Sequence, residues 1–334
     1  MREFTALNVA SKSKAWQCSV QLKARRTAGS RGYIDVHKYR SRVQAQKACS
    51  FAAGCVSRAA LAFLALMQQK VVLITGGTSG IGLACAQAFG QAGARVVFTG
   101  RDEARLQQTQ VQLAGLGIQA LAVRADVGEE ADCRRAVDAA VQAFGRLDVL
   151  VNNAGISMRA LFADASLDVI RRLMQTNFFG TVYTTKYALP HLLRSRGSVV
   201  GVSSIAGYRG LPGRTGYSAS KFAMNGFLEA LRTEMAPQGV HVLTACPGFT
   251  ASNIRNTALA ADGSAQGESP RDESRLMSSE EVAGHILRAV QQRSPTLVLT
   301  GKGRLTVFLN KWLPAGLMDR LVLNEFRKEK NSPV

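Results

Sequence analysis

The glycine-rich stretch from Thr75 to Gly82 constrains the fold of this chain more than any other feature. It reads TGGTSGIG, follows the apolar, mostly β-branched run Lys70–Ile74, and leads into the helical stretch Leu83–Gln91. A buried strand, a glycine turn and a helix in this order form the setting that a dinucleotide-binding turn requires. Glycines let the backbone approach a pyrophosphate, and the helix N-terminus offers it free N–H groups. A glycine-rich loop that binds nothing is the alternative for this segment taken alone.

Short apolar runs alternate with longer helical stretches from residue 70 to about residue 300. Continuous Val, Ile and Leu runs are typical of strands buried in a parallel sheet, and alternation with helices predicts a doubly wound α/β sheet of the Rossmann type. The expected strands are Lys70–Ile74, Arg95–Thr99, Gln119–Ala125, Asp148–Asn152, Ser198–Ser203, His241–Cys246 and Thr296–Thr300. Seven strands with their crossovers fit one domain, although 334 residues could by length alone hold two.

Tyr217 and Lys221 form a candidate pair for proton transfer. They stand four residues apart in the sequence YSASK, which is one helical turn, so both side chains project from one face. A free tyrosine has a pKa of about 10, and a fixed neighbouring cation favours its phenolate form. Such a pair is common on ordinary helix surfaces, so its meaning depends on the rest of the chain.

Further motifs follow the glycine turn in the order of a known family. The turn has the spacing Thr-Gly-x-x-x-Gly-x-Gly, and Ser204 stands 13 residues before Tyr217. The other motifs are Asp126–Val127, Asn152–Asn153–Ala154–Gly155, Asn177, Ser203–Ser204 and Pro247–Gly248. From Lys70 onward the chain therefore resembles the short-chain dehydrogenase/reductase family. The segment Thr257–Ser264 and the C-terminal tail resemble its "member seven"-type branch.

The resemblance implies an enzyme that interconverts a carbonyl and an alcohol. Tyr217 would be the general acid and base, and Lys221 would hold the nicotinamide ribose and lower the pKa of the tyrosine. Ser204 would hydrogen-bond the substrate oxygen, and Asn177 would hold a water that links Lys221 to solvent. Ser203 is expected to be structural, because consecutive residues at a strand end point to opposite sides. A non-catalytic dinucleotide-binding protein of the same fold is the alternative.

The resemblance also implies a set of cofactor-binding residues. These are Thr75, Gly76, Ser79, Gly80, Ile81, Gly82, Arg101, Asp126, Val127, Asn153, Ala154, Gly155, Tyr217, Lys221, Pro247, Gly248 and Thr250. The residue that binds the cofactor carboxamide is either Thr250 or Ser252.

The end of the second expected strand indicates which dinucleotide is bound. Folds that prefer NAD keep an acidic residue here for the ribose 2′-hydroxyl, whereas this chain has Gly100 followed by Arg101. A guanidinium binds a 2′-phosphate in two-pronged fashion, so we expect NADP(H) rather than NAD(H). The alternative is that Arg101 merely begins the next helix and faces solvent.

Two later segments depart from the strand–helix pattern. Asn253–Ser279 holds few large apolar residues and is expected to be either a mobile lid over the substrate or an ordinary surface loop. Leu305–Phe326 interleaves apolar and basic residues, so it could lie on a membrane, cover an apolar pocket or pack on its own domain. Pro314 makes one straight helix across it improbable. The branch resemblance suggests a bulky apolar substrate of lipid, steroid or retinoid type.

The first 66 residues differ in composition from the rest. They carry twelve Lys or Arg against Glu3 and Asp35, a net charge of +10 out of +19 for the chain. Such a composition predicts a disordered extension. Three explanations compete for the basic composition of residues 1–66. The segment is a translation artefact with the natural start at Met67, a targeting peptide, or a basic tail that contacts nucleic acid or anionic lipid. The expected division is 1–66 for the extension, 67–300 for the Rossmann domain and 301–334 for the amphipathic tail.

The remaining composition limits the other function classes. The six cysteines and four histidines form no C-x-x-C pair or His cluster, so no metal site is expected. No histidine stands near Tyr217, which leaves a Ser-His-Asp hydrolase unsupported. Charge alone does not indicate a specific nucleic-acid partner. Isolated cysteines favour a cytoplasmic protein, with an organellar or peripheral membrane location as the alternative. Family members commonly form homo-oligomers through the helices carrying Asn177 and Tyr217.

Overall fold

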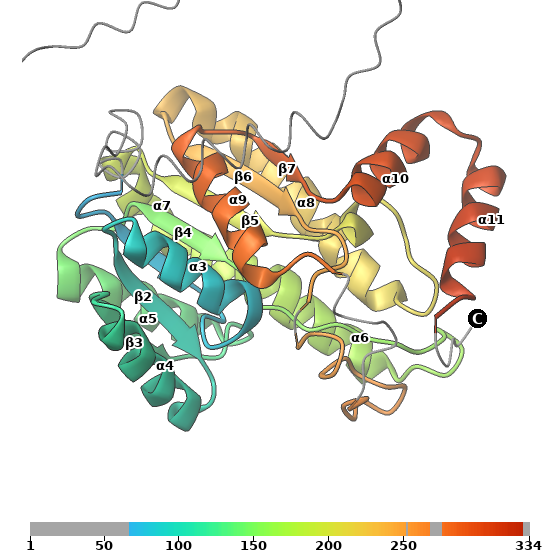
Figure 1. The fold of residues 1–334 in the computed structure, drawn as a ribbon, viewed down its shortest axis with the longest axis horizontal. Helices are drawn as coiled ribbons and strands as arrows, with labels where there is room; N and C mark the ends of the chain where they lie inside the picture. The colour runs from blue at the N-terminus through green and yellow to red at the C-terminus, as the bar shows by residue number, and fades with distance from the viewer. Residues whose placement is uncertain (1–66, 252, 268–275, 330–334) are drawn as a thin grey trace, which may run out of the picture. The chain divides into compact units, whose positions relative to one another are not determined.

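The computed structural model describes residues 67–251, 253–267 and 276–329, and these form one parallel sheet of seven strands with helices on both faces (Figure 1). The strands are β1 (Val71–Ile74), β2 (Arg95–Gly100), β3 (Ala120–Arg124), β4 (Val149–Asn152), β5 (Ser198–Val202), β6 (His241–Cys246) and β7 (Thr296–Val298). Each lies where the sequence predicted a strand, with ends shifted by at most two residues. The predicted doubly wound Rossmann fold is therefore confirmed.

The strand order places β1 and β4 side by side at the centre of the sheet. The order is β3-β2-β1-β4-β5-β6-β7, and all neighbours are parallel. The chain thus first builds outward from β1 through β2 to β3, and then returns to the other side of β1 with β4. Ligands of open α/β sheets bind at such a switch point, beyond the carboxyl ends of the strands.

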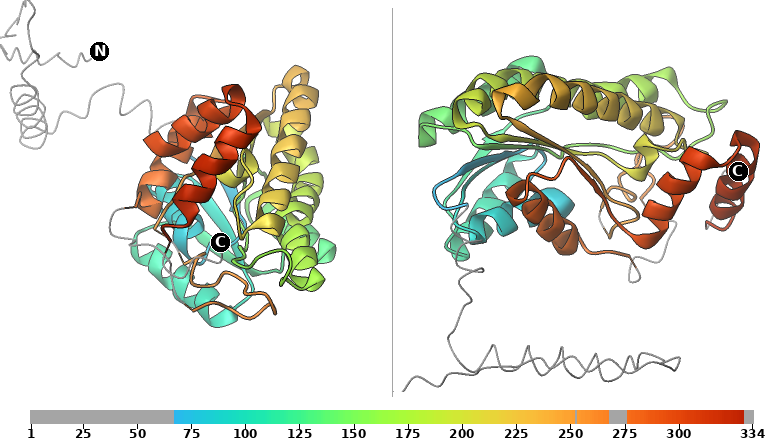
Figure 2. Two further views of the ribbon diagram at one scale, coloured as in Figure 1. Left: turned by 90° about the vertical axis from the view of Figure 1, so that its right-hand side faces the viewer. Right: turned by 90° about the horizontal axis from the view of Figure 1, so that it is seen from above.

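Helices cover both faces of the sheet. They are α3 (Gly80–Gln91), α4 (Glu103–Gly115), α5 (Glu130–Phe144), α6 (Leu167–Leu173), α7 (Gly180–Ser195), α8 (Thr215–Met235), α9 (Ser279–Gln291), α10 (Gly301–Trp312) and α11 (Ala315–Phe326). Shorter turns are η1 (Met174–Phe179), η2 (Ile205–Gly207) and η3 (Ala236–Gln238). Buried side chains of α3, α4 and α9 pack on one face of the sheet, and those of α5, α7 and α8 pack on the other (Figure 2).

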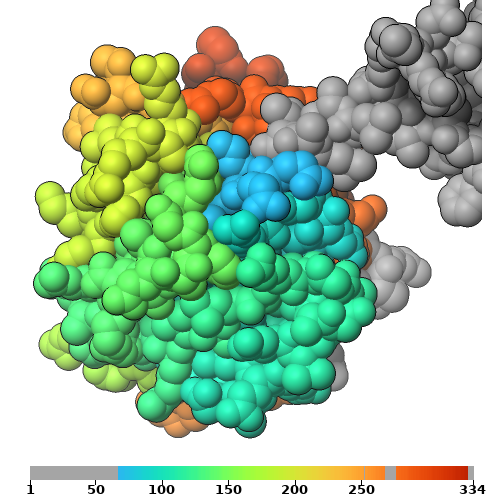
Figure 3. All heavy atoms as spheres, turned by 90° about the vertical axis from the view of Figure 1, so that its left-hand side faces the viewer, coloured from blue at the N-terminus to red at the C-terminus, as the bar shows by residue number. Residues whose placement is uncertain are grey.

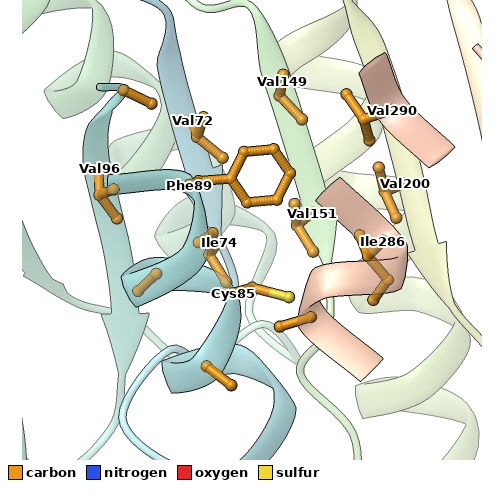
Figure 4. Packing of buried hydrophobic residues seen from close by; sticks show 14 of the residues in the cluster. Val72, Ile74, Cys85, Phe89, Val96, Val149, Val151, Val200, Ile286 and Val290 are labelled. Atoms are coloured by element: carbon orange, nitrogen blue, oxygen red, sulfur yellow. The ribbon is translucent and has the colours of Figure 1, made fainter. Parts of the chain in front are cut away.

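The larger core cluster lies between α3, α9 and the central strands. Phe89 of α3 is fully buried, and Figure 4 shows its ring between Val72 and Val151 of the sheet, with Ile286 of α9 nearby. Alternate residues of each strand face opposite sides, so Val72 and Ile74 enter this cluster while Val71 and Leu73 enter the other. The continuous apolar runs seen in the sequence are explained by burial of both faces.

Local sequence signals set several helix ends. Ser278 and Glu281 form a reciprocal capping box at the start of α9. Helix α5 has Glu130 and Asp132 in its first turn and is followed by Gly145 in the left-handed conformation. Pro314 separates α10 from α11, as the sequence predicted.

Several expectations concern residues outside the described part of the chain. These are residues 1–66 with Cys18, Cys49 and Cys55, the residue Ser252, the stretch 268–275 and the last residues 330–334. Within the described residues, Cys85, Cys133 and Cys246 are free and buried, and no group of His, Cys, Asp or Glu is placed to hold a metal ion. None of the described helices is both long and apolar enough to cross a bilayer.

Candidate active site

A cleft of about 740 Å³ opens at the carboxyl ends of the strands. Its lining contains all of the site residues predicted from the sequence except Thr75, Gly82 and Asn177. The glycine turn after β1 and the pair Tyr217 and Lys221 on α8 therefore face one space. Thr75, Gly82 and Asn177 lie behind the lining, and each has a structural role there.

The backbone of the glycine turn requires the absence of side chains. A Cβ atom on Gly82 would lie 2.1 Å from the carbonyl oxygen of Gly76, and one on Gly76 would lie 2.9 Å from Cα of Ala154. Gly76 and Gly80 also have positive φ angles of 65° and 51°. Gly82 is thus needed for the close packing of turn and helix, which explains why it does not itself line the cleft.

The start of α3 suits an anion. Ser79 is its N-cap residue, its first turn holds no acidic residue, and within the described chain no side chain caps it by a hydrogen bond. The first N–H groups of the helix, with the positive end of the helix dipole, point toward the cleft side of the turn. The cradle of glycine backbone and uncapped helix therefore fits a dinucleotide pyrophosphate.

Thr75 and Asn153 join the turns that follow β1 and β4, and the predicted contact of Thr75 with the cofactor remains a prediction. The Thr75 hydroxyl accepts hydrogen bonds from the backbone N–H groups of Asn153 and Ala154, both at 3.0 Å. The Asn153 side-chain amide donates to the carbonyl oxygens of Thr75 and Gly76, also at 3.0 Å. Thr75 is buried and lies behind the cleft, so it positions the lining without belonging to it.

The end of β2 presents basic side chains to the cleft. Gly100, Arg101 and Arg105 line it, and the Arg101 guanidinium lies 3.7 Å from the carboxylate of Asp126. Asp102 is close by, but its carboxylate accepts a hydrogen bond from the Arg105 N–H at 3.1 Å and so caps α4. Arg105 was not singled out from the sequence, because only the turn of α4 brings it beside Arg101.

Tyr217 and Lys221 lie one turn apart on α8, as the sequence predicted. The Lys221 ammonium is buried, donates to the carbonyl oxygen of Val202 at 2.9 Å, and lies 5.9 Å from the centre of the Tyr217 ring. Ser204 follows β5, and its hydroxyl accepts from the N–H of Ala206 at 3.1 Å. Three polar groups thus gather around one part of the cleft.

Burial shifts the pKa values of Tyr217 and Lys221 in opposite directions. Burial raises the pKa of Tyr217 above its ordinary value of 10.0, although a hydrogen bond with Ser204 and the positive charge of Arg214 act against the rise. Burial also lowers the pKa of Lys221 to about 8. The expected lowering of the tyrosine pKa is not found, because desolvation of the phenol outweighs the groups that stabilise phenolate.

Asn177 lies behind the cleft and organises its wall. It is fully buried in the π-helical turn η1, where its side-chain oxygen accepts from the N–H of Ile156 at 2.8 Å. Its amide nitrogen donates to the Ile156 carbonyl and to the Ser220 hydroxyl, both at 2.9 Å. Both amide hydrogens are thereby used, so the side chain ties the loop after β4 to α8. Its predicted contact with a water remains a prediction.

The segment after β6 contributes part of the cleft wall. Leu259 pairs with the loop after β4: its N–H donates to Ser157 at 2.9 Å, and its carbonyl accepts from Arg159 at 2.9 Å. Ile254, Arg255, Thr257 and Leu259 line the cleft. The described part of Asn253–Ser279 therefore covers the site, while its motion as a lid stays a prediction.

The far wall of the cleft involves residues that sequence reasoning missed. Arg214 and Phe249 line it, and both contact the end of the C-terminal tail. The Arg214 guanidinium pairs with the buried carboxylate of Glu329 at 2.9 Å and lies 4.8 Å from the ring centre of Phe326. Arg159 lies 3.8 Å from the same carboxylate. No local pattern marked Glu329, because its partners are more than 100 residues away in the chain.

Comparisons with known proteins agree with this arrangement. The model of the short chain dehydrogenase family matches residues 70–262. The bovine "Dehydrogenase/reductase SDR family member 7B" is 39% identical over 276 residues, covering 80% of this chain and 85% of that protein. The "11-beta-hydroxysteroid dehydrogenase A" of Arachis hypogaea is 42% identical over 198 residues, covering 58% of this chain and 56% of that protein. A crystal structure of a short chain dehydrogenase/reductase from Burkholderia phymatum in complex with NAD has a TM-score of 0.65 and 26% identity, covering 73% of this chain and 93% of that one.

Proposed function

Because this chain belongs to the short-chain dehydrogenases, which are oxidoreductases that use a nicotinamide dinucleotide, we propose that it interconverts a carbonyl and an alcohol with Tyr217 as general acid and base. The observation that carries the proposal is one cleft lined both by the glycine turn and by Ser204, Tyr217 and Lys221. The glycine turn would hold the pyrophosphate of a dinucleotide, and the three side chains line the same cleft.

Each of the three side chains has a defined task in this proposal. The cofactor supplies the hydride, and the protein supplies orientation and proton transfer. Tyr217 donates its proton to the carbonyl oxygen in reduction, and its raised pKa keeps the phenol protonated at neutral pH. Ser204 donates a hydrogen bond to the same oxygen as negative charge develops there. Lys221 would hold the nicotinamide ribose, and its ammonium, 5.9 Å from the centre of the Tyr217 ring, favours the phenolate that remains after the proton has been donated.

For the cofactor we propose NADP(H). The cleft at the end of β2 is lined by Gly100, Arg101 and Arg105, so two guanidinium groups lie where a 2′-phosphate would bind. Both are in exposed ion pairs, Arg101 with Asp126 at 3.7 Å and Arg105 with Asp102 at 3.5 Å, which a phosphate would have to displace or share. The neighbouring carboxylate of Asp102 is used in capping α4. The bacterial neighbour was solved with NAD, so a direct comparison of the two cofactors is the test.

For the substrate we propose a bulky apolar carbonyl or alcohol of lipid, steroid or retinoid type. Ile156, Leu211, Phe249 and Leu259 contribute apolar side chains to the cleft. The name of the Arachis hypogaea relative refers to a hydroxysteroid, which agrees with such a substrate.

We further propose a homo-oligomer that works in the cytoplasm. Phe179, Leu193 and Phe222 are exposed apolar side chains on η1, α7 and α8, which is where family members commonly pair. The described cysteines are free, as suits a reducing compartment. An organellar location is the alternative, and a peripheral position on a membrane is compatible with the cytoplasm as well. Gel filtration tests the oligomer, and imaging of the tagged full chain tests the location.

The test is a screen of NADPH oxidation by the full chain with aldehydes, ketosteroids, retinal and acyl-ketone lipids. With an active substrate, Tyr217→Phe should lose nearly all turnover and still quench or shift the fluorescence of bound NADPH. The matched control is Tyr187→Phe, which removes a phenol hydroxyl that bonds Glu130 at the surface. Near-wild-type kcat in Tyr217→Phe would disprove the assigned role.

A further inference from the structure

The C-terminal helices α10 and α11 carry large apolar side chains on their outer face. In α10 these side chains recur at positions i, i+3 and i+7, and in α11 at i and i+4, so each helix has one apolar stripe. They are Leu305, Phe308 and Trp312 in α10 and Leu317 and Leu321 in α11, with exposed fractions of 45% to 68%. The rings of Phe308 and Trp312 lie 6.5 Å apart, so the stripe is continuous at this point.

The opposite face of the same helices is firmly attached to the domain. Met318, Val322 and Phe326 of α11 pack with Leu211 and Phe249, which themselves line the cleft. Polar contacts add to this attachment: Asn310 donates to the carbonyl of Tyr208 at 2.9 Å, Arg209 pairs with Asp319, and Arg214 pairs with Glu329. The outer stripe is therefore held in place from behind, at one end of the domain (Figure 2).

Basic residues flank the stripe. Helices α10 and α11 and the residues up to 329 contain the cations Lys302, Arg304, Lys311, Arg320, Arg327 and Lys328. All six are exposed, and two of them, Lys302 and Lys328, pair with Glu325 of the same segment. Asp319 and Glu329 pair instead with Arg209 and Arg214 of the domain, so residues 301–329 carry six positive and three negative charges, a net charge of +3. The Lys311 ammonium lies 5.8 Å from the ring centre of Trp312, so cation and aromatic share one patch.

We propose that this outer face of α10 and α11 docks onto the surface of a bilayer that contains anionic lipid, with the helices lying in the plane of the membrane. Aromatic and aliphatic side chains enter the headgroup–acyl boundary, and lysines and arginines bind lipid phosphates. A second copy of the chain fits less well, because the two like-charged faces would repel one another. The docking itself does not depend on the proposed reaction.

Docking would place the substrate end of the cleft against the membrane. The inner face of α11 packs on Leu211 and Phe249, so only α11 lies between its outer stripe and these two residues of the cleft lining. An apolar substrate dissolved in the bilayer would then reach the cleft without crossing water. This consequence, unlike the docking, rests on the proposed function.

The experiment measures binding of the full chain to vesicles of phosphatidylcholine with and without phosphatidylserine. Trp16→Phe leaves Trp312 as the one tryptophan, so a blue shift of its emission reports burial of this face. Phe308→Ser should weaken co-sedimentation with the anionic vesicles at least about tenfold, which is the loss expected when one large apolar side chain is no longer buried. Lys311→Glu should lower affinity for the anionic vesicles and leave the weak binding to neutral vesicles unchanged.

The matched control is Val111→Ser, which removes an exposed apolar side chain from α4, on the opposite side of the domain from α10 and α11 (Figure 1). Figure 3 shows the surface of the domain on that opposite side. It should bind vesicles like the unmodified chain. If the chain binds vesicles but the emission of Trp312 does not shift to the blue, the proposal is overturned. The basic residues 1–66 alone would give that result. Self-association that Phe308→Ser abolishes, in the absence of any vesicle binding, also overturns the proposal. Turnover of a water-soluble substrate should be unaltered in Phe308→Ser, which separates this test from that of the proposed function.

Discussion

Replacing Lys221 with methionine should make the protein more stable at neutral pH while removing its activity. Lys221 is 3% exposed, and burial lowers the pKa of its ammonium from 10.5 to about 8. Methionine has a similar length and fills the site without a charge, next to the sulfur of Met224, which lies 3.8 Å from the ammonium. The substitution therefore relieves the desolvation of a buried cation.

The size of the effect follows from the two pKa values. The difference between 10.5 and about 8 corresponds to about 3 kcal/mol of lost folding free energy wherever the group is charged in both states. Loss of the hydrogen bond to Val202 offsets about 1 kcal/mol. The net gain is about 2 kcal/mol below pH 8. As pH rises from 8 to 10.5 the folded chain gives up the proton while the unfolded chain still holds it, so the gain disappears.

Urea unfolding of both proteins at pH 7 and pH 10 measures this difference. Lys186→Met on the exposed surface of α7 is the matched control, and it should change stability by less than about 0.5 kcal/mol at both pH values. Turnover of Lys221→Met should be lost at every pH. A Lys221→Met protein that is no more stable than the unmodified one at pH 7, or whose advantage is unchanged at pH 10, would refute the reasoning.

Three further predictions concern other parts of the site. Arg101→Ala should lower kcat/KM for NADPH at least about tenfold and change that for NADH little, measured by initial rates; equal losses would argue against a 2′-phosphate contact. Gly82→Ala should abolish dinucleotide binding measured by calorimetry, because the added Cβ would meet the Gly76 carbonyl. The control Gly284→Ala adds a Cβ in open space in the middle of α9 and should raise the melting temperature slightly. Glu329→Gln should cost about 3 kcal/mol by leaving buried guanidinium charge less compensated, seen as easier proteolysis of the tail; unchanged stability would contradict this.

The parts of the fold that the sequence could predict are those determined by neighbouring residues. The strands β1, β4 and β6 can be recognised from their continuous apolar runs, because both faces of each strand are buried. The glycine turn and the spacing of Tyr217 and Lys221 are likewise local. These features required no knowledge of which strands lie side by side.

The unpredicted parts depend on contacts between distant segments. The hydroxyl of Thr75 turns toward Asn153 because β1 and β4 are neighbours, which the sequence does not state. The pKa of Tyr217 rises because Met158 and Leu173 pack beside it. The pairing of Arg214 with Glu329 spans 115 residues, and either residue alone looks like an ordinary surface charge.

The attachment of Glu329 to Arg159 and Arg214 also has a consequence for biosynthesis. The helix α3 that carries the pyrophosphate cradle has its full support once α9 has been made and packs on it, but the far wall of the cleft is closed only when residue 329 has been made. A nascent chain can therefore acquire its nucleotide-binding half before it has a finished substrate pocket. Ribosome-stalled chains released before this carboxylate appears should hold the coenzyme and still turn over nothing.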